Sequence, residues 1–270
     1  MPGKAAPLDA SLFHRENREV AGQPFIRVRG LEQKFGSQHV LRGVDMEVQR
    51  GETLVLLGGS GGGKSVLVKH FPGLLRPWKG TVEIDGEDIS ELDERAMASY
   101  RRKVGIMFQS GALFDSMTVG ENVAFPLREM GVKEEAEIAE RVSEALEIVR
   151  LPGQERKMPA ELSGGMRKRV ALARAVVGKP ASVLYDEPHA GLDPITADSI
   201  DHLIKDLQIT HGMTNVVITH EMRSVFHIAD RIIFLQEGRI YWTGGPDELK
   251  ATDDPVLRPF IEGNSGEAWN

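Results

Sequence analysis

The sequence predicts an α/β domain with a buried, mainly parallel β-sheet, an antiparallel β layer on one side and an inserted helical subdomain. Short, almost continuous apolar runs alternate with helical patterns, which is typical of parallel strands covered on both faces. Near the N-terminus, other runs alternate apolar and polar residues and indicate half-exposed strands. From residue 109 to about residue 161 the buried runs stop and helical periodicity takes over.

Each element has its own signal along the chain. The half-exposed strands are expected at residues 25–29, 40–48 and 81–84, with a turn at Asp85-Gly86. The buried strands are expected at residues 53–57, 104–108, 182–185, 215–218 and 231–235. In the helical subdomain, about residues 110–165, Thr118 and Glu121 form a capping box, and an apolar stripe follows at Ile138, Val142, Ala145, Leu146 and Val149. Asp193 and Pro194 begin another helix, whose apolar face is expected to comprise Ile195, Ile200, Leu203, Ile204 and Leu207.

The composition is that of an ordinary soluble protein, with 270 residues, 41% of them hydrophobic and 27% charged. A net charge of −7 argues against a general nucleic-acid binder, because phosphate backbones are bound by basic surfaces. The absence of cysteine excludes disulfides, zinc-thiolate sites and thiol chemistry. No apolar run approaches the roughly 20 residues of a membrane-spanning helix. Residues 1–24 are interpreted as a mobile leader without the apolar core of a signal peptide, and residues 249–270 as a short tail.

The run Gly58–Ser65 fits the phosphate-loop pattern of Gly, four residues and Gly-Lys-Ser. It lies between a predicted strand and a predicted helix, where a flexible glycine linker would not be expected. Glycines let the backbone turn its N–H groups toward an anion, and the following helix presents its positive end to the same anion. Lys64 would reach the β- and γ-phosphates, and Ser65 would offer its hydroxyl to Mg2+. The expected nucleotide contacts are Gly58, Gly59, Ser60, Gly61, Gly62, Gly63, Lys64, Ser65 and Val66.

Two further motifs carry candidate chemistry. Asp186 and Glu187 end a buried strand, and ligands of parallel sheets bind at the carboxyl ends of the strands. Asp186 would hold Mg2+ beside the phosphate loop, and Glu187 would polarise an attacking water, unless the two form only a solvated pair. The run Leu162–Met166, with Ser163 as N-cap, starts a helix whose end is either a second anion site or a simple cap.

These motifs, in this order and approximate spacing, resemble the nucleotide-binding subunits of ABC transporters over about residues 25–248. The resemblance rests on Gly58–Ser65, Gln109, Leu162–Met166, Asp186-Glu187, Ala190–Asp193 and His220. It implies a P-loop NTPase with a RecA-like core that uses ATP and Mg2+.

The resemblance also implies a role for each site residue. Lys64 and the loop amides would grip phosphate, and Mg2+ would be bound by Ser65, Gln109 and Asp186. Glu187 would be the catalytic base and His220 the sensor of the γ-phosphate. Phe35 occupies the position of the aromatic ring that packs on adenine, although Phe35 taken alone is more often a core residue.

In that family the Ser163, Gly164 and Gly165 motif meets the ATP bound by the other subunit. A single copy of each motif therefore implies a head-to-tail homodimer with two ATP molecules at its interface. Asp193 would lie across the same interface, a role compatible with capping its helix.

A narrower resemblance lies in Gln109–Pro126, which is similar to the corresponding segment of ATPases that serve Mla-type phospholipid transporters with Mce-type lipid-binding partners. Its start is rich in apolar residues: Ala112, Leu113, Phe114 and Met117. An exposed patch here would suit docking of a permease coupling helix, whereas the alternative is that these side chains pack the helical subdomain. The resemblance implies a peripheral location on the cytoplasmic face of the inner membrane, through the permease, and no nucleic-acid partner.

Two positions depart from the family pattern, and other functions fit the motifs. Gly59 stands where Pro is common, and His189 where Thr is common; a histidine near a carboxylate is most often a surface residue. The motif set fits equally the ATPase of another importer, for instance one for polar amino acids. A non-transport ABC ATPase of division or cofactor assembly is a further alternative, whereas the coiled-coil insertion of repair ATPases has no counterpart in this sequence.

Overall fold

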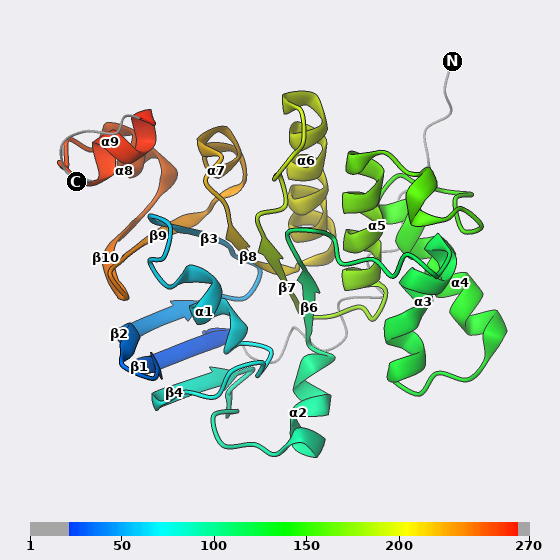
Figure 1. The fold of residues 1–270 in the computed structure, drawn as a ribbon, viewed down its shortest axis with the longest axis horizontal. Helices are drawn as coiled ribbons and strands as arrows, with labels where there is room; N and C mark the ends of the chain where they lie inside the picture. The colour runs from blue at the N-terminus through cyan, green and yellow to red at the C-terminus, as the bar shows by residue number, and fades with distance from the viewer. Residues whose placement is uncertain (1–21, 264–270) are drawn as a thin grey trace.

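The computed structural model describes residues 22–263, in which two β-sheets meet and helices cover the outer face of the larger sheet (Figure 1). The larger sheet has the strand order β10-β9-β3-β8-β7-β6, and the smaller has the order β2-β1-β4-β5. Most of the expected leader and the last residues of the expected tail, 1–21 and 264–270, lie outside the described residues. The division into a leader, residues 25–248 and a tail therefore remains a proposal.

The larger sheet contains every buried strand expected from the apolar runs. Its parallel strands are β3 (Thr53–Leu57), β6 (Val104–Met107), β7 (Ser182–Asp186), β8 (Thr214–Ile218) and β9 (Arg231–Gln236). An antiparallel edge strand, β10 (Arg239–Gly244), follows β9 and was not predicted. Phe108, expected within β6, lies just beyond its end and is 38% exposed. The prediction of a mainly parallel sheet is confirmed.

The smaller sheet is the expected antiparallel layer. It contains β1 (Ile26–Phe35), β2 (Gln38–Val48), β4 (Lys79–Ile84) and β5 (Glu87–Asp88). β1 pairs with β2 and with β4, so that Ile26 lies opposite both Val48 and Ile84. Asp85 and Gly86 connect β4 to β5 with φ values of 57° and 82°, the left-handed pair that a tight hairpin turn requires.

Helices lie between most of the strands, and the three N-caps predicted from the sequence are present. In chain order the helices are α1 (Lys64–Lys69), α2 (Glu94–Arg101), α3 (Val119–Glu129), α4 (Glu135–Ile148), the 3₁₀-helix η2 (Pro159–Glu161), α5 (Gly164–Val176), α6 (Pro194–His211), α7 (Met222–Ile228), α8 (Pro246–Ala251) and α9 (Leu257–Glu262). The Thr118–Glu121 capping box is present at α3, and the side chains of Ser163 and Asp193 cap α5 and α6. Helices α3 and α4 lie beyond β6, at one end of the molecule (Figure 1).

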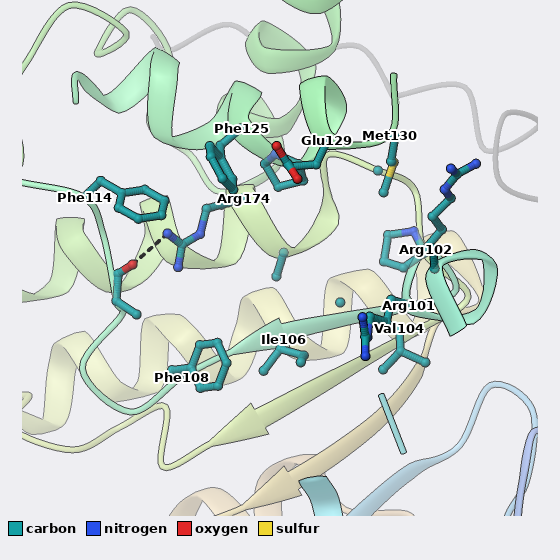
Figure 2. A pocket seen from close by; sticks show the side chains of 17 residues that line it. Arg101, Arg102, Val104, Ile106, Phe108, Phe114, Phe125, Glu129, Met130 and Arg174 are labelled. Atoms are coloured by element: carbon teal, nitrogen blue, oxygen red, sulfur yellow. Dashed lines mark hydrogen bonds between the residues drawn. The ribbon is translucent and has the colours of Figure 1, made fainter. Parts of the chain in front are cut away.

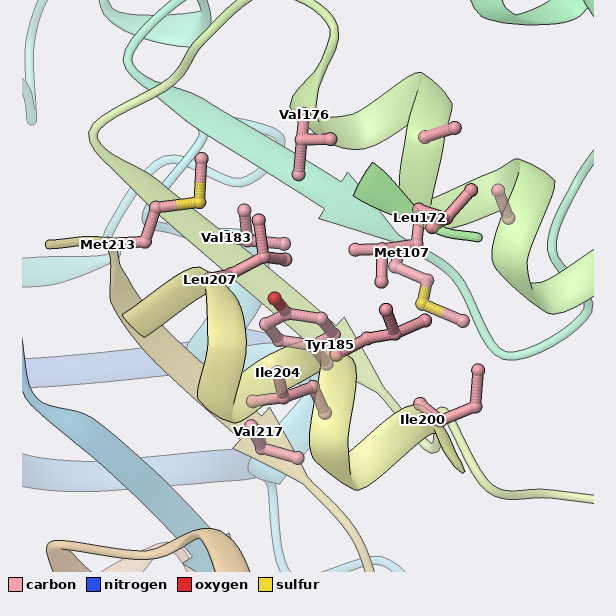
Figure 3. Close-up of a cluster of buried hydrophobic side chains, with 14 of the residues drawn as sticks. Met107, Leu172, Val176, Val183, Tyr185, Ile200, Ile204, Leu207, Met213 and Val217 are labelled. Atoms are coloured by element: carbon pink, nitrogen blue, oxygen red, sulfur yellow. The ribbon is translucent and has the colours of Figure 1, made fainter. Parts of the chain in front are cut away.

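Two hydrophobic clusters hold these layers together. One lies between the larger sheet and α5 and α6, where Tyr185 of β7 is surrounded by side chains of both helices (Figure 3). The other fills the space between the two sheets and includes Leu54 and Leu56 of β3 with Ile26 and Val28 of β1. Burial of these fully enclosed aliphatic side chains stabilises the fold by about 1.5–3 kcal/mol for each one.

Two expectations about helices need correction. Ile195, assigned to the apolar face of α6, is 84% exposed, because it precedes Ile200 by five residues and therefore lies about 140° around the helix from it, on the outer side. Residues from 249 onward, expected as a short tail, continue α8 and form α9, and Leu249 and Leu257 are fully buried in the main cluster. This part of the chain therefore packs against the sheet domain at least as far as Glu262.

Candidate nucleotide site

The phosphate loop connects β3 to α1, as its context predicts. Gly58 has a φ of 139°, and a Cβ at this position would lie 2.0 Å from the main-chain oxygen of Leu235. Gly63 has a φ of 101°, and a Cβ there would lie 2.8 Å from Leu41 Cδ2. Gly58 therefore requires glycine for both conformation and space, whereas Gly63 requires it chiefly for its conformation, because the Leu41 side chain can shift. Gly59 and Ser60 continue the loop, and the N–H of Gly62 donates to Gly59 O at 3.2 Å.

The Lys64 side chain folds back over the phosphate loop. Its Nζ donates to the carbonyl oxygens of Gly58 at 2.7 Å and Gly59 at 2.9 Å. Burial lowers the pKa of Lys64, and the nearby charges of Glu187 and Asp186 act in the opposite direction. The ammonium is thus partly desolvated within a ring of oxygen atoms, where a phosphate would find a preorganised cation.

Asp186 and Ser65 meet at the carboxyl end of β7. Both line one small cavity beside α1, which also contains Lys69. Burial raises the pKa of the Asp186 carboxyl, and the charge of Glu187 adds to this effect. Because burial disfavours the charged form of Asp186, a bound cation would stabilise the ionised carboxylate. The oxygen atoms of Asp186 and Ser65 are therefore suited to bind a cation. Gln109 lies beyond the end of β6 and is exposed.

Glu187 and His220 form a close pair. Glu187 Oε2 lies 2.9 Å from His220 Nδ1, with 17% of the Glu187 side chain and 73% of the His220 side chain exposed. The Glu187 backbone is in the left-handed region, with a φ of 49°, and its N–H donates to Ile218 O at 2.9 Å. Such backbone strain persists only where the surrounding structure holds it, and it is concentrated at functional sites.

A buried lysine that the sequence analysis did not select links these parts. Lys168 of α5 is 7% exposed, and its Nζ donates to the main-chain oxygen of Gln109 and, at 3.3 Å, to that of Glu187. Burial lowers its pKa, while Glu187 and Asp186 raise it. Lys168 lies in a basic run between Arg167, which is exposed, and Arg169, which is half-buried, so no local signal in the sequence distinguished it.

Ser163, Gly164 and Gly165 lie away from the phosphate loop of the same chain. In Figure 1, α5 lies beyond β7 and β6 as seen from α1. A Cβ on Gly165 would be 2.4 Å from Thr196 Cγ2, so the first turn of α5 packs closely on the first turn of α6. Asp193 caps that turn, with Oδ1 accepting from Ile195 N and Thr196 N at 3.0 and 3.1 Å. The structure thus brings the Ser163 motif to Asp193 but does not bring it to Lys64.

Phe35 and Val66 occupy opposite environments. Phe35 ends β1 and is 46% exposed, so the alternative that it is a core residue is wrong. Val66, in α1, is half-buried and packs against the cluster between the two sheets. An exposed ring at the end of β1 is free to stack on a flat ligand.

A broad apolar groove of about 680 Å³ lies beside the segment after Gln109 (Figure 2). Its lining includes Ala112, Phe114 and Phe125, and Figure 2 shows the Arg174 side chain between the two aromatic rings. Arg174 donates to Gly111 O and Ala112 O at 2.8 and 2.7 Å, which fixes the start of the segment on α5. Phe114 is 42% exposed and forms the mouth of the groove, whereas Leu113 turns inward and packs on the main core.

Comparison with known proteins identifies the family. Residues 41–190, more than half of the chain, match the family model described as ABC transporter. The chain belongs to the ABC transporter family. Within that family the domain is an ATPase, and its P-loop fold is that of an ATP-binding cassette. Within residues 22–263, none of the helices of this ABC domain combines the length and apolar character needed to cross a bilayer.

Several curated proteins resemble this ABC domain over most of its length. It is 42% identical to the "Probable ribonucleotide transport ATP-binding protein mkl" of Mycobacterium leprae, over 88% of this chain and 69% of that protein. It is 39% identical to "Protein TRIGALACTOSYLDIACYLGLYCEROL 3, chloroplastic" of Arabidopsis thaliana, over 88% and 74%. It is 40% identical to "Methionine import ATP-binding protein MetN" of Brucella abortus, over 93% and 65%. The chain thus spans about two thirds to three quarters of the length of these relatives.

Solved structures agree with the fold. A dimeric post-hydrolysis state of the ATP-binding cassette MJ0796, bound to ADP and Pi, superposes with a TM-score of 0.75 at 31% identity, covering 82% of this chain and 98% of that one. Clostridium perfringens cbiO1, part of the ABC transporter complex cbiONQ, superposes with a TM-score of 0.79 at 32% identity, covering 87% and 94%.

Proposed function

We propose that this chain is the ATP-hydrolysing subunit of a phospholipid transporter and acts as a homodimer beneath a membrane permease. The observation that carries the enzymatic part is the convergence of Lys64, Asp186 and the Glu187–His220 pair at the carboxyl ends of the parallel strands.

The site suits the β- and γ-phosphates of ATP. On binding, Lys64 would exchange the carbonyl oxygens of Gly58 and Gly59 for phosphate oxygens, and the loop N–H groups would surround the same charge. Phe35, exposed at the end of β1, would stack on adenine. Val66 lies in the first turn of α1 and would offer its main-chain N–H to the same phosphates.

Mg2+ fits the donors at this site. Among residues 22–263, no group of three or more His, Asp or Glu side chains is arranged to hold a metal. The Ser65 hydroxyl and the Asp186 carboxylate line one cavity. With the amide oxygen of Gln109 and phosphate oxygens they would make the hard oxygen set that Mg2+ prefers. Bound there, the ion would neutralise charge on the transferring phosphoryl group.

Hydrolysis would be an in-line attack of water on the γ-phosphorus. Glu187 Oε1 or Oε2 would accept a hydrogen bond from the water and then its proton, while the bond between the γ-phosphorus and the β,γ-bridging oxygen breaks. His220, 2.9 Å from Glu187, would orient the carboxylate and contact the γ-phosphate from its exposed side. Lys64 would stabilise the charge that develops on the phosphate oxygens.

A second copy of the chain would complete the site. The Ser163–Gly165 motif and Asp193 lie together and away from Lys64, so their contribution to ATP binding would come from the partner. The structures of MJ0796 are described as dimeric, and one contains ADP and Pi. The exposed N-terminus of α5 would then face the γ-phosphate held by the partner's phosphate loop.

The apolar groove supports a permease partner. Three aromatic side chains, Phe108, Phe114 and Phe125, line it together with Arg101, Arg102 and Arg174. The three rings suit a short amphipathic helix that presents apolar side chains. Arg101 and Arg174 already bond Glu94 and the carbonyl oxygens of Gly111 and Ala112, so Arg102 is the arginine that would pair with an acidic residue of that helix. Because Gln109 immediately precedes the groove-lining segment, a helix seated there could report on the nucleotide. The proposed location is the cytoplasmic face of the inner membrane, through this permease.

Phospholipid is the cargo that we propose, in cooperation with an Mce-type lipid-binding protein. The Gln109–Pro126 segment resembles that of Mla-type ATPases, and one relative bears the name of a glycolipid, trigalactosyldiacylglycerol. Methionine import is the second candidate, because MetN matches 93% of the chain, and ribonucleotide transport is named for the mycobacterial relative. The candidate catalytic residues by themselves do not discriminate between these cargoes.

Copurification tests the proposal. The full chain, tagged and extracted with detergent from its own cells, is expected to bring down an integral-membrane protein and an Mce-type protein. Vesicles containing that complex should transfer labelled phospholipid only when ATP is supplied. Phe114→Glu should abolish the copurification while leaving basal ATP hydrolysis intact, because Phe114 lies at the groove mouth. ATP-driven uptake of methionine or ribonucleotide without lipid transfer would contradict the lipid assignment.

A further inference from the structure

A buried polar network joins the loop that follows Glu187 to the loop that carries His220. Its centre is His189, which is 7% exposed, contrary to the expectation of a surface histidine. His189 Nε2 lies 2.7 Å from Asp201 Oδ1 on α6, and His189 Nδ1 lies 3.3 Å from Thr219 Oγ1. Asp201 Oδ2 accepts a hydrogen bond of 2.8 Å from Ser224 Oγ on α7. One imidazole thus connects both loops to two helices.

The network is complete when His189 carries its proton on Nε2. Nε2–H then donates to the Asp201 carboxylate, which can only accept when ionised, and Nδ1 accepts from the Thr219 hydroxyl. The Thr219 oxygen accepts in turn from the N–H of Glu221 at 3.1 Å. A buried polar network with every group paired has one favoured geometry, because any rotation leaves a group unpaired.

This geometry fixes the relative position of the two reacting groups. The loops already share one main-chain bond, from Glu187 N to Ile218 O, at 2.9 Å. A single bond allows the loops to pivot about it, and the His189–Thr219 contact supplies a second fixed point next to His220. The left-handed backbone of Glu187 needs such over-determination, because its strain would otherwise be released.

The network also reaches the predicted subunit interface. His189 lies between Glu187 and Asp193 in one loop, and Asp201 lies on the helix that Asp193 caps. The His189–Asp201 bond therefore links the loop directly to α6. Both side chains are buried, so neither touches the nucleotide, and any effect on the reaction must act through other residues.

We propose that His189, held by Asp201, is a positioning residue that couples the two loops and keeps Glu187 and His220 in reacting geometry. This inference rests on the proposed ATP hydrolysis. A positioning role predicts that the catalytic rate depends on the hydrogen bond between His189 and Thr219. Folding stability depends instead on whether the buried side chains at positions 189 and 201 are both polar or both apolar.

A double substitution separates these two quantities. His189→Phe keeps a ring of similar volume and removes both hydrogen bonds, which leaves the buried Asp201 carboxylate short of a donor. Asp201→Leu leaves His189 without its acceptor. The double variant replaces both partners by apolar side chains, and such a replacement restores stability although the single changes reduce it. His202→Phe is the control, because His202 adjoins Asp201 on α6 but half of its side chain is exposed.

The full chain and each variant are compared by steady-state ATP hydrolysis, by the Kd of a non-hydrolysable ATP analogue and by Tm. The Tm should fall in both single variants and recover in part in the double variant, in which the Thr219 and Ser224 hydroxyls still lack their acceptors. The kcat of His189→Phe and of the double variant should be lowered by about tenfold to a hundredfold, as for a displaced catalytic group, while the Kd stays within about twofold. His202→Phe should retain the wild-type kcat and Kd.

Two results would overturn the inference: wild-type kcat in His189→Phe, or a kcat that recovers together with Tm in the double variant. The second would show that the network serves stability alone. A wild-type chain that hydrolysed no ATP would overturn the proposed function and this inference together. The wild-type rate, measured first, therefore distinguishes the two failures.

Discussion

His220 Nδ1 lies 2.9 Å from Glu187 Oε2, across the ends of the neighbouring strands β8 and β7. The imidazole is mostly exposed and the carboxylate is mostly covered, so the pair presents its polar face to solvent beside the phosphate loop. The positions of both groups follow from strand register. Asp186 of β7 is paired with Ile218 of β8, and Glu187 and His220 follow these paired residues by one and two positions.

Glu187→Gln should leave ATP bound but not hydrolysed. The amide keeps the shape of the side chain and its hydrogen bonding to His220, but it cannot accept a proton from water. We expect kcat to fall by about 10²- to 10⁴-fold, the usual contribution of a general base, with little change in the Kd of ATP. Single-turnover hydrolysis and equilibrium binding measure the two quantities. Glu140→Gln, on the exposed face of α4, is the control, and a fully active Glu187→Gln chain would refute the base assignment.

Lys64→Ala should weaken nucleotide binding itself. The substitution removes the cation that the loop carbonyls hold in place, and charge-assisted bonds to phosphate contribute about 1.5–3 kcal/mol each. The Kd for ATP should therefore rise by about tenfold or more. Fluorescence titration with a labelled ATP analogue checks this, and an unchanged Kd in a folded variant would show that Lys64 does not contact phosphate.

Gly58→Ala and Gly153→Ala form a matched pair. Both glycines have positive φ values, 139° and 73°, but a Cβ at Gly58 would lie 2.0 Å from Leu235 O, whereas a Cβ at Gly153 meets no atom within 4 Å. Gly153→Ala should lower the free energy of unfolding by about 1–2 kcal/mol from backbone strain alone. Gly58→Ala should cost at least about 1 kcal/mol more and should impair ATP binding. Denaturant unfolding and ATP titration measure the difference, and equal effects at the two positions would contradict the close packing of the loop on β9.

Asp186→Asn should raise the stability of the ligand-free protein at neutral pH. Burial, together with the charge of Glu187, raises the pKa of Asp186 above its ordinary value of 3.8. The folded state therefore holds this proton more tightly than the unfolded state, and wild-type stability falls as pH rises from 3.8 through the raised pKa. The asparagine side chain does not ionise, so the variant does not lose this stability. Its Tm should therefore rise above that of the wild type as the pH increases from 3.8 through the raised pKa, and the two Tm values should agree below pH 3.8. The same variant should lose Mg2+-dependent hydrolysis, and a lower Tm at pH 7 would contradict the electrostatic argument.

Much of the site could be predicted because its signals are local. The phosphate loop, the Ser163 and Asp193 caps and the carboxylates ending β7 each depend on a few consecutive residues, and the structure has the expected strand, loop or helix at each one. The strands of the larger sheet are recognisable for the same reason, since burial on both faces leaves a continuous apolar run.

The remaining features depend on contacts between distant segments. His189 is buried because Asp201, 12 residues away, and Thr219, 30 residues away, converge on it, which no local pattern encodes. Lys168 is a functional candidate only once Gln109 and Glu187 are seen to present their carbonyl oxygens to it.

The central claim, that ATP hydrolysis takes place between two copies of the chain, is tested most directly by mixing two inactive variants. Lys64→Ala disables the phosphate loop, and Ser163→Phe blocks the motif that would face the partner's nucleotide. In a mixed dimer one site would carry both defects and the other neither. Equal amounts should regain about a quarter of the wild-type rate, because half of randomly assorted dimers are mixed and each has one intact site. A mixture as inactive as its components would contradict the claim.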